Sequence, residues 1–194
     1  RELETETLYA KVFQSKILLV YGASGTGKTS LIQCGLSNKF QESDWLPVFI
    51  RRGGVDIRRS FMEKIRESLL SPIATDISLK KAIQSLYLDH FKPVFFIFDQ
   101  FEELFIFGNH DEQTAFAGQI LEIIRSEMNC RFIFSIREEY IAGLSLFEEI
   151  IPEFFDNRIR IEKMTRKNAL EAITGPCKKA AIDVEDKFPE LLLE

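Results

Sequence analysis

The chain has 194 residues, of which 45% are hydrophobic and 28% are charged, a balance that indicates a packed globular domain and excludes a disordered chain. Its formal net charge of −5 counts against a dedicated nucleic-acid binder, because such proteins usually carry a basic balance or a basic face. No apolar run approaches the roughly 18 residues that a membrane span needs, so no membrane contact is expected.

Five short apolar or β-branched runs alternate with helix-like segments, which is typical of an α/β fold with a mostly parallel, buried sheet. The predicted strands cover residues 17–21, 48–51, 94–98, 132–136 and 158–161. The third run is apolar without alternation, as expected for a strand that is buried on both faces.

Helical periodicity fills the segments between these strands. It predicts one helix over about residues 28–39, a second with Phe61, Ile65, Leu69 and Leu70 on one face, and a third with Phe116, Ile120, Ile123 and Ile124 on one face. Thr165 is typical of an N-cap, and the helix that follows is expected to stop at Gly175-Pro176. We therefore predict a sheet domain over residues 1–163 and the beginning of a helical subdomain over residues 164–194.

The segment from Gly22 to Thr29 matches the P-loop pattern G-x-x-x-x-G-K-S/T between a predicted strand and a predicted helix. Glycines let the backbone wrap around phosphate oxygens, and the helix adds its positive N-terminal end. Lys28 would reach the β- and γ-phosphates, and the Thr29 hydroxyl would ligate Mg²⁺. The predicted nucleotide-binding residues are Gly22, Ala23, Ser24, Gly25, Thr26, Gly27, Lys28, Thr29 and Ser30. The pattern predicts a bound nucleoside triphosphate, and the lack of an N-K-x-D guanine-recognition run favours ATP.

Acidic residues follow the third predicted strand, at the sheet edge where ligands bind in such folds. Asp99 would hold Mg²⁺, directly or through a water. Hydrolysis needs a group that orients or deprotonates the attacking water, and Glu102 or Glu103 could serve. The residues alone leave the choice between the two glutamates open.

Arginines near the predicted site allow two interpretations each. Arg137 ends the fourth predicted strand and could contact the γ-phosphate, or it could pair on the surface with Glu138 or Glu139. The cluster Arg51, Arg52, Arg58 and Arg59 could meet phosphates, but a solvated loop and helix start is the simpler interpretation.

The three cysteines, Cys34, Cys130 and Cys177, form no C-x-x-C pair and have no histidine at ligand spacing. Such a scattered, odd set predicts reduced thiols in a cytoplasmic protein, without a disulfide framework or a zinc site. The chain begins at Arg1 without a methionine and ends in an apolar segment, from which we expect a piece of a longer protein.

Three segments together resemble the STAND class of P-loop ATPases, in particular its bacterial novel-STAND branch. They are YGASGTGKTSLIQCGL, FFIFDQFEELF and FIFSIREEY; the opening Arg1-Glu2-Leu3-Glu4 resembles the tail of the G-R-E-x-E signature without its glycine. The resemblance implies a sheet order of 5-1-4-3-2, Arg137 as γ-phosphate sensor, and a helical lid after residue 163. It also implies a switch in which ATP replaces ADP, permits homo-oligomerisation and signals to effector and sensor domains, as bacterial relatives do in defence against phage.

One departure from related ATPases concerns hydrolysis. Gln100 stands where many of them carry the catalytic glutamate, so slow turnover is expected. Three alternatives to a slow ATPase switch stay open: a nucleotide-binding interaction module that never hydrolyses, a DNA-associated AAA+-type ATPase that uses the arginines of residues 51–59, and a small-molecule kinase.

Overall fold

A five-stranded sheet forms the centre of the computed structural model, which describes residues 1–180 and 182. Its strands are β1 (Ile17–Gly22), β2 (Leu46–Ile50), β3 (Val94–Phe98), β4 (Cys130–Arg137) and β5 (Arg158–Arg160). All neighbours pair in parallel, in the order β2-β3-β4-β1-β5. This order is the predicted 5-1-4-3-2 read from the opposite edge, so the predicted P-loop NTPase sheet is confirmed.

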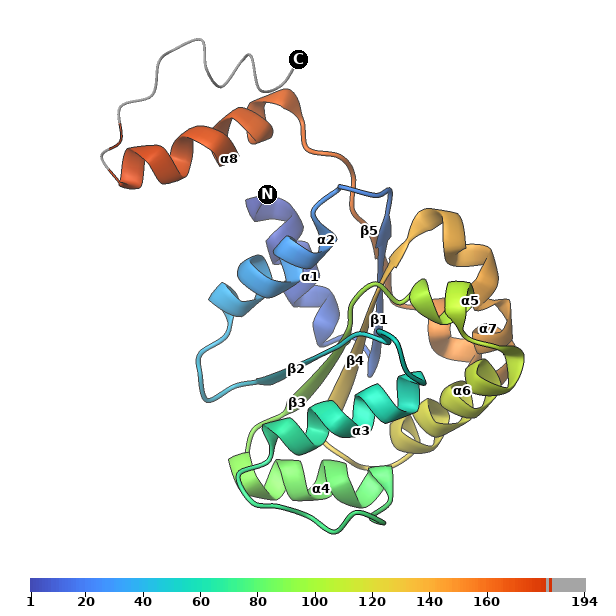
Figure 1. The fold of residues 1–194 in the computed structure, drawn as a ribbon. Helices are drawn as coiled ribbons and strands as arrows, with labels where there is room; N and C mark the ends of the chain where they lie inside the picture. The colour runs from blue at the N-terminus through green and yellow to red at the C-terminus, as the bar shows by residue number, and fades with distance from the viewer. Residues whose placement is uncertain (181, 183–194) are drawn as a thin grey trace.

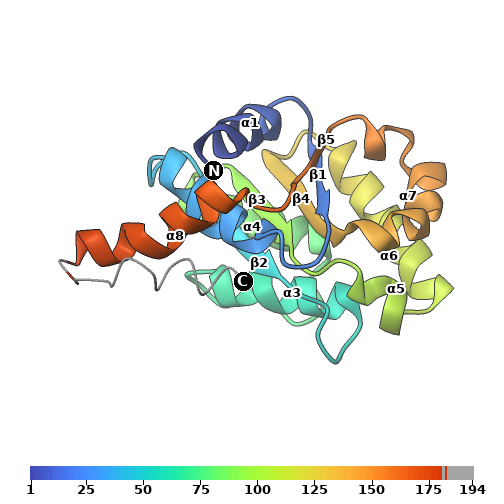
Figure 2. The same cartoon turned by 90° about the horizontal axis from the view of Figure 1, so that it is seen from above.

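Helices cover both faces of the sheet and complete a three-layer sandwich (Figures 1 and 2). The helices of this domain are α1 (Glu2–Val12), α2 (Lys28–Ser30), α3 (Ile57–Ser68), α4 (Leu79–His90), α5 (Glu103–Phe107), α6 (His110–Ile124) and α7 (Ser145–Ile150). The last helix, α8 (Arg166–Lys179), follows β5 and covers neither face of the sheet. Short 3₁₀ segments span Ser37–Lys39, Glu138–Leu144 and Pro152–Phe155. Among the described residues, no helix has the length and apolar character to cross a membrane.

The strands bury opposite faces in two separate cores, which explains why their sequences do not alternate. Phe96 and Phe98 join the core beneath α3, α4, α6 and α7, whereas Phe95 and Ile97 join the core beneath α1. The first core is rich in aromatic pairs at edge-on or stacked geometry, such as Phe61 with Phe96 at 4.8 Å between ring centroids. These two cores hold the carboxyl ends of the strands in fixed register.

The helix after β1 changes type along its length. It begins as α2, continues as a π-helix over Leu31–Leu36 and ends as a 3₁₀ turn. Gly35 lies in the π-segment, where a Cβ atom would stand 2.9 Å from the Thr5 hydroxyl of α1. The glycine therefore allows α1 to pack closely against the helix that leaves the P-loop.

Two predicted helix ends are wrong. The second helix stops at Ser68 because Leu69 is extended, and Leu70 is 71% exposed rather than part of the apolar face. The last helix is capped by the Thr165 hydroxyl as predicted, but it continues through Gly175 and Pro176 to Lys179. A proline inside a helix removes one backbone hydrogen-bond donor, and this helix continues for three residues beyond Pro176 without that donor.

Removal of a central ring from the first core should destabilise the fold strongly. Phe132 is fully buried and contacts Phe96 at 5.5 Å between ring centroids, so we expect Phe132→Ala to lower the free energy of unfolding by about 3–5 kcal/mol. Phe91 is 73% exposed, and Phe91→Ala should change the free energy of unfolding by less than about 0.5 kcal/mol. Urea denaturation of both variants measures the difference, and equal losses would contradict this account of the core.

Candidate functional site

The P-loop connects β1 to α2 through two glycines in left-handed conformation. Gly25 and Gly27 have φ values of +75° and +81°, which L-residues with a side chain adopt only at a cost. Between them, the Thr26 side chain is buried and its hydroxyl donates to the Ala23 carbonyl at 3.0 Å. These conformations form the turn that leads directly into the N-terminus of α2.

Lys28 folds across this loop. Its Nζ donates to the carbonyls of Gly22 and Ala23 at 2.7 and 3.0 Å. Partial burial lowers the pKa of Lys28, and the nearby carboxylates of Glu102 and Glu139 oppose that shift. The ammonium group therefore stands at the loop with only backbone oxygens as partners, available to a ligand of higher negative charge.

Asp99 follows β3 and is 4% exposed. One carboxylate oxygen accepts a hydrogen bond from the Thr29 hydroxyl at 2.8 Å. The other accepts from Nε and an Nη of Arg51 at 3.1 and 2.5 Å. The buried charge of Asp99 is thus shared between the P-loop helix and the end of β2, and its own backbone N–H donates to Ile50 at 2.9 Å.

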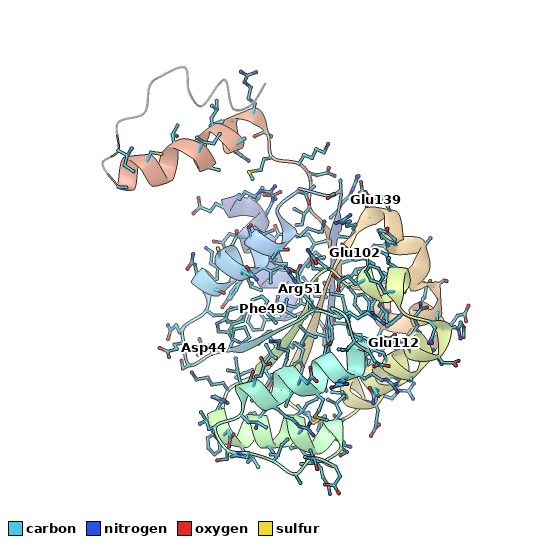
Figure 3. All side chains as sticks on the ribbon, viewed as in Figure 1. Asp44, Phe49, Arg51, Glu102, Glu112 and Glu139 are labelled. Carbon is cyan, nitrogen blue, oxygen red and sulfur yellow. The ribbon has the colours of Figure 1, made fainter. Side chains whose placement is uncertain are left out.

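Glu102 lies at the same end of the sheet as Arg51 (Figure 3). Its side chain is 5% exposed and pairs with Nε of Arg137 at 3.0 Å. The second carboxylate oxygen accepts from the Arg137 backbone N–H at 3.3 Å. Of the two alternatives for Arg137, the pairing with Glu138 or Glu139 is not the one found, because its half-exposed side chain reaches the buried carboxylate of Glu102 instead.

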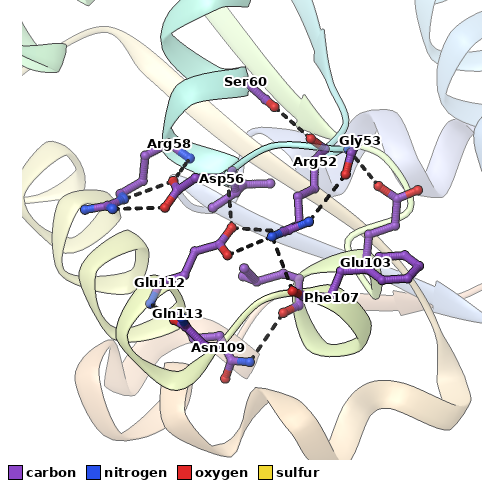
Figure 4. Close-up of polar contacts among 12 residues, drawn as sticks. Arg52, Gly53, Asp56, Arg58, Ser60, Glu103, Phe107, Asn109, Glu112 and Gln113 are labelled. Atoms are coloured by element: carbon purple, nitrogen blue, oxygen red, sulfur yellow. Dashed lines mark hydrogen bonds and ion pairs between the residues drawn. The ribbon is translucent and has the colours of Figure 1, made fainter.

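Glu103 faces another way. Its carboxylate accepts from the backbone N–H of Gly53, in the loop between β2 and α3 (Figure 4). In the same network Arg52 forms a two-pronged ion pair with Glu112, with both bonds at 3.0 Å. The side chains of Arg52 and Glu112 are only 12% and 7% exposed. The expectation of a fully solvated arginine cluster is wrong for Arg52.

A cleft of about 250 Å³ collects most of the predicted site. Its walls are Ser24, Gly25, Gly27, Lys28, Thr29, Asp99, Gln100, Glu102, Ser135 and Arg137. Of the other predicted residues, Gly22 ends β1, Ala23 and Thr26 shape the loop, Ser30 is exposed at the end of α2, and Glu103 faces the loop after β2. Thus the three carboxyl ends of β1, β3 and β4 meet at one cavity.

Sequence reasoning named Arg51 and Gln100, but it missed the ion pair of the first and the backbone conformation of the second. Arg51 binds Asp99, and its position one residue after β2 was the available signal, because parallel strands end at the same sheet edge. Gln100 lines the cleft with φ of 56°, a left-handed conformation that costs a non-glycine residue about 1 kcal/mol. No sequence pattern marks that conformation in advance.

A larger hollow of about 730 Å³ lies near the opposite ends of the strands, between α4 and the segment 125–129. Its lining includes Tyr87 and Leu88, and it brings together fewer charged groups than the cleft does. Convergent polar groups distinguish a chemical site from a surface hollow, so the smaller cleft is the candidate.

The donor set in the cleft fits magnesium. A hydroxyl and a carboxylate, from Thr29 and Asp99, stand 2.8 Å apart, and Mg²⁺ prefers such oxygen ligands from a few side chains, with phosphates and waters as the remainder. Across the described part of the chain, no group of three or more His, Cys, Asp or Glu side chains forms a cage for a metal ion. Phosphate oxygens and waters would complete the coordination of a magnesium ion held by Thr29 and Asp99.

Comparison with known proteins gives one family over the whole chain. Residues 1–194 match the family described as Novel STAND NTPase 1. A comparison with curated proteins returns no match.

Solved structures share the fold at low sequence identity. The Walker-type ATPase PABY2304 of Pyrococcus abyssi has a TM-score of 0.69 and 13% identity, over 100% of this chain and 62% of that one. The ORC2 protein of Aeropyrum pernix, solved as ADPNP–ADP complexes, has a TM-score of 0.66 and 15% identity, over 90% and 51%. Cdc6p of Pyrobaculum aerophilum has a TM-score of 0.65 and 15% identity, over 92% and 49%. The chain thus spans about half to three-fifths of these proteins.

The close approach of β5 to the P-loop generates a prediction. A Cβ atom at Gly22 would stand 2.3 Å from the Ile161 carbonyl oxygen, so Gly22→Ala must push the two segments apart and should lower the free energy of unfolding by about 2–3 kcal/mol. At Gly25 the added carbon meets nothing within 4 Å. Gly25→Ala should lower the free energy of unfolding by only about 1 kcal/mol, because alanine is disfavoured at the positive φ of this residue. Chemical denaturation compares them, and an equal loss would contradict the steric explanation.

Proposed function

Because the chain belongs to the Novel STAND NTPase 1 family, we propose that it is an NTPase domain that binds ATP with Mg²⁺ and hydrolyses it slowly. The observation that carries this proposal is the contact between the Thr29 hydroxyl of the P-loop and the buried carboxylate of Asp99, at 2.8 Å in one cleft. In this proposal residues 1–163 form the nucleotide-binding domain and a helical lid begins with α8; the rest of the predicted subdomain, residues 181 and 183–194, lies outside the described residues. The adenine nucleotides of the similar ORC2 structure support ATP as the ligand.

Each binding residue has a distinct task in this proposal. The backbone N–H groups of the P-loop and the N-terminus of α2 attract phosphate oxygens, and Lys28 turns from its two carbonyl partners toward the β- and γ-phosphates. Thr29 and Asp99 hold the metal. Mg²⁺, when bound, neutralises phosphate charge during the transfer.

We assign the orientation of the attacking water to Glu102, because its buried carboxylate lines the cleft while that of Glu103 is bonded to Gly53. Arg137 holds Glu102 in this structure and would exchange that partner for the γ-phosphate when ATP binds. ADP lacks that phosphate, so the exchange would let the domain distinguish ATP from ADP.

The wider role follows the resemblance of the sequence to signalling ATPases. In the proposal, the domain is the switch of a longer cytoplasmic protein of a bacterium, whose ATP-bound form associates with copies of itself and activates an effector, as in defence against phage. A role on DNA has less support here. Arg51, Arg52, Arg58 and Arg59 each pair with a carboxylate of the chain.

Calorimetric titration with ATP and ADP, with and without Mg²⁺, tests the binding proposal. Lys28→Ala removes the main counter-charge to the phosphates and should weaken ATP binding by about 100-fold, since hydrogen bonds to charged groups contribute about 1.5–3 kcal/mol each. The matched control is Lys64→Ala, which removes an exposed lysine paired with Glu67 on α3 and should bind as the unaltered protein does. Unchanged ATP affinity in the Lys28 variant would refute the P-loop assignment.

Steady-state phosphate release tests the catalytic assignment. Glu102→Gln keeps an oxygen for Arg137 but loses the basic carboxylate, so turnover should fall at least about 100-fold with ATP affinity retained. Glu103→Gln is the neighbouring control and should retain most of the turnover, because its carboxylate does not line the cleft. If the two variants hydrolyse ATP equally well, Glu102 is not the water-orienting group. If the unaltered protein binds ATP without any turnover, the domain is a non-hydrolysing nucleotide-binding module.

A further inference from the structure

The guanidinium group of Arg51 engages the metal-holding candidate Asp99 directly. Two of its nitrogens reach one carboxylate oxygen, at 3.1 and 2.5 Å, while the Thr29 hydroxyl occupies the other oxygen. Asp99 is 4% exposed and Arg51 is 51% exposed. A buried carboxylate is costly without a nearby positive charge, and Arg51 supplies that charge from the solvent side.

The backbone beside Arg51 is fixed, so its side chain is the part that can move. Arg52 is held by its buried ion pair with Glu112, and its carbonyl accepts from the Ser60 hydroxyl at 2.8 Å (Figure 4). Glu112 also accepts from the backbone N–H of Ile57 at 2.7 Å, which ties the start of α3 to α6. Arg51 therefore stands on an anchored loop with a half-exposed side chain that reaches Asp99.

We propose that Arg51 is the positioning residue that neutralises Asp99 in the absence of magnesium, and that it sets how strongly nucleotide binding depends on the metal. The inference rests on the proposed function, because it takes Asp99 and Thr29 as the magnesium ligands. A guanidinium group and a divalent cation repel one another, and both need the charge of the same carboxylate. Arg51 and the metal are therefore alternative counter-ions of Asp99.

This exchange has opposite consequences with and without metal. When Mg²⁺ is absent, Arg51 shields the phosphates from the negative charge of Asp99, so nucleotide binds to a cleft of reduced repulsion. When Mg²⁺ is present, Arg51 has to leave the carboxylate, and its departure opposes metal binding. Both effects reduce the difference between nucleotide affinity with and without magnesium.

The first measurement compares the dissociation constants of ADP and ATP in excess Mg²⁺ and in EDTA, by calorimetry. For each nucleotide, the ratio of the dissociation constant in EDTA to that in Mg²⁺ should be about tenfold higher in Arg51→Ala than in the unaltered protein, which corresponds to about 1.4 kcal/mol. Arg51→Lys keeps the charge but loses the forked geometry, so it should fall between the two. The control Arg59→Ala removes an exposed arginine that pairs with Glu63 on α3, and its ratio should equal that of the unaltered protein.

The second measurement needs no nucleotide. In EDTA, Arg51→Ala should melt at a lower temperature than Arg59→Ala, because it leaves the buried carboxylate of Asp99 without its counter-ion. Added Mg²⁺ should raise the melting temperature of Arg51→Ala more than that of the unaltered protein.

The two measurements separate the inference from the proposed function. If nucleotide binds all variants and the ratio in Arg51→Ala equals that in Arg59→Ala, the inference is wrong and nucleotide binding stands. If nucleotide binds none of them but the magnesium-dependent melting shift is specific to Arg51→Ala, the proposed function is wrong and the exchange at Asp99 stands. A magnesium-dependent melting shift of equal size in Arg51→Ala, Arg59→Ala and the unaltered protein would also overturn the inference.

Discussion

The buried carboxylate of Asp99 is the interaction on which the arrangement of the site depends. It joins three segments that are distant in sequence: the P-loop helix through Thr29, the end of β2 through Arg51, and β3, which it directly follows. The parallel order of the sheet makes this possible, because β1, which leads into the P-loop, ends at the same edge as β2 and β3. A carboxylate taken out of water requires partners for both oxygens, and the chain provides them from its own elements.

Each of the two buried acidic residues of the cleft forms an ion pair with an arginine. Asp99 is matched by Arg51 and Glu102 by Arg137, and in both pairs the acid is buried while the arginine is about half exposed. Acids near a phosphate site would otherwise repel the ligand. Because each arginine reaches its partner from the solvent side, either can move without disturbing the core, and the acids stay in place on their strands.

Sequence reasoning predicted the elements whose residue patterns carry a local cause, and it failed where the cause lies in distant contacts. The apolar run before Asp99 and the glycines of the P-loop specify strand and loop directly, and residues 94–98 are predicted to the residue. α4 was missed, because only Ala82, Ile83 and Leu86 of its 12 residues are buried. The position of Arg51 after a strand places it at the same sheet edge as Asp99, but its ion pair with that carboxylate depends on side-chain contacts that no local pattern specifies. The same holds for the pairing of Arg137 with Glu102.

The junction between β5 and the P-loop has a mechanical consequence. Ile161 follows β5, its N–H donates to Tyr21 at 2.7 Å and its carbonyl closes on Gly22, while Arg1 bridges the carbonyls of Thr26 and Glu162. α8 begins at Arg166, five residues after Ile161, and lies beyond the sheet (Figure 1). With a rise of about 1.5 Å per residue, its 14 residues span about 21 Å. A rotation of about 10° at this junction would carry the far end of such a rod by about 4 Å. Because the P-loop and the segment that leads into α8 share these contacts, a movement of the loop around a phosphate would be passed on to α8 and would be largest at its far end.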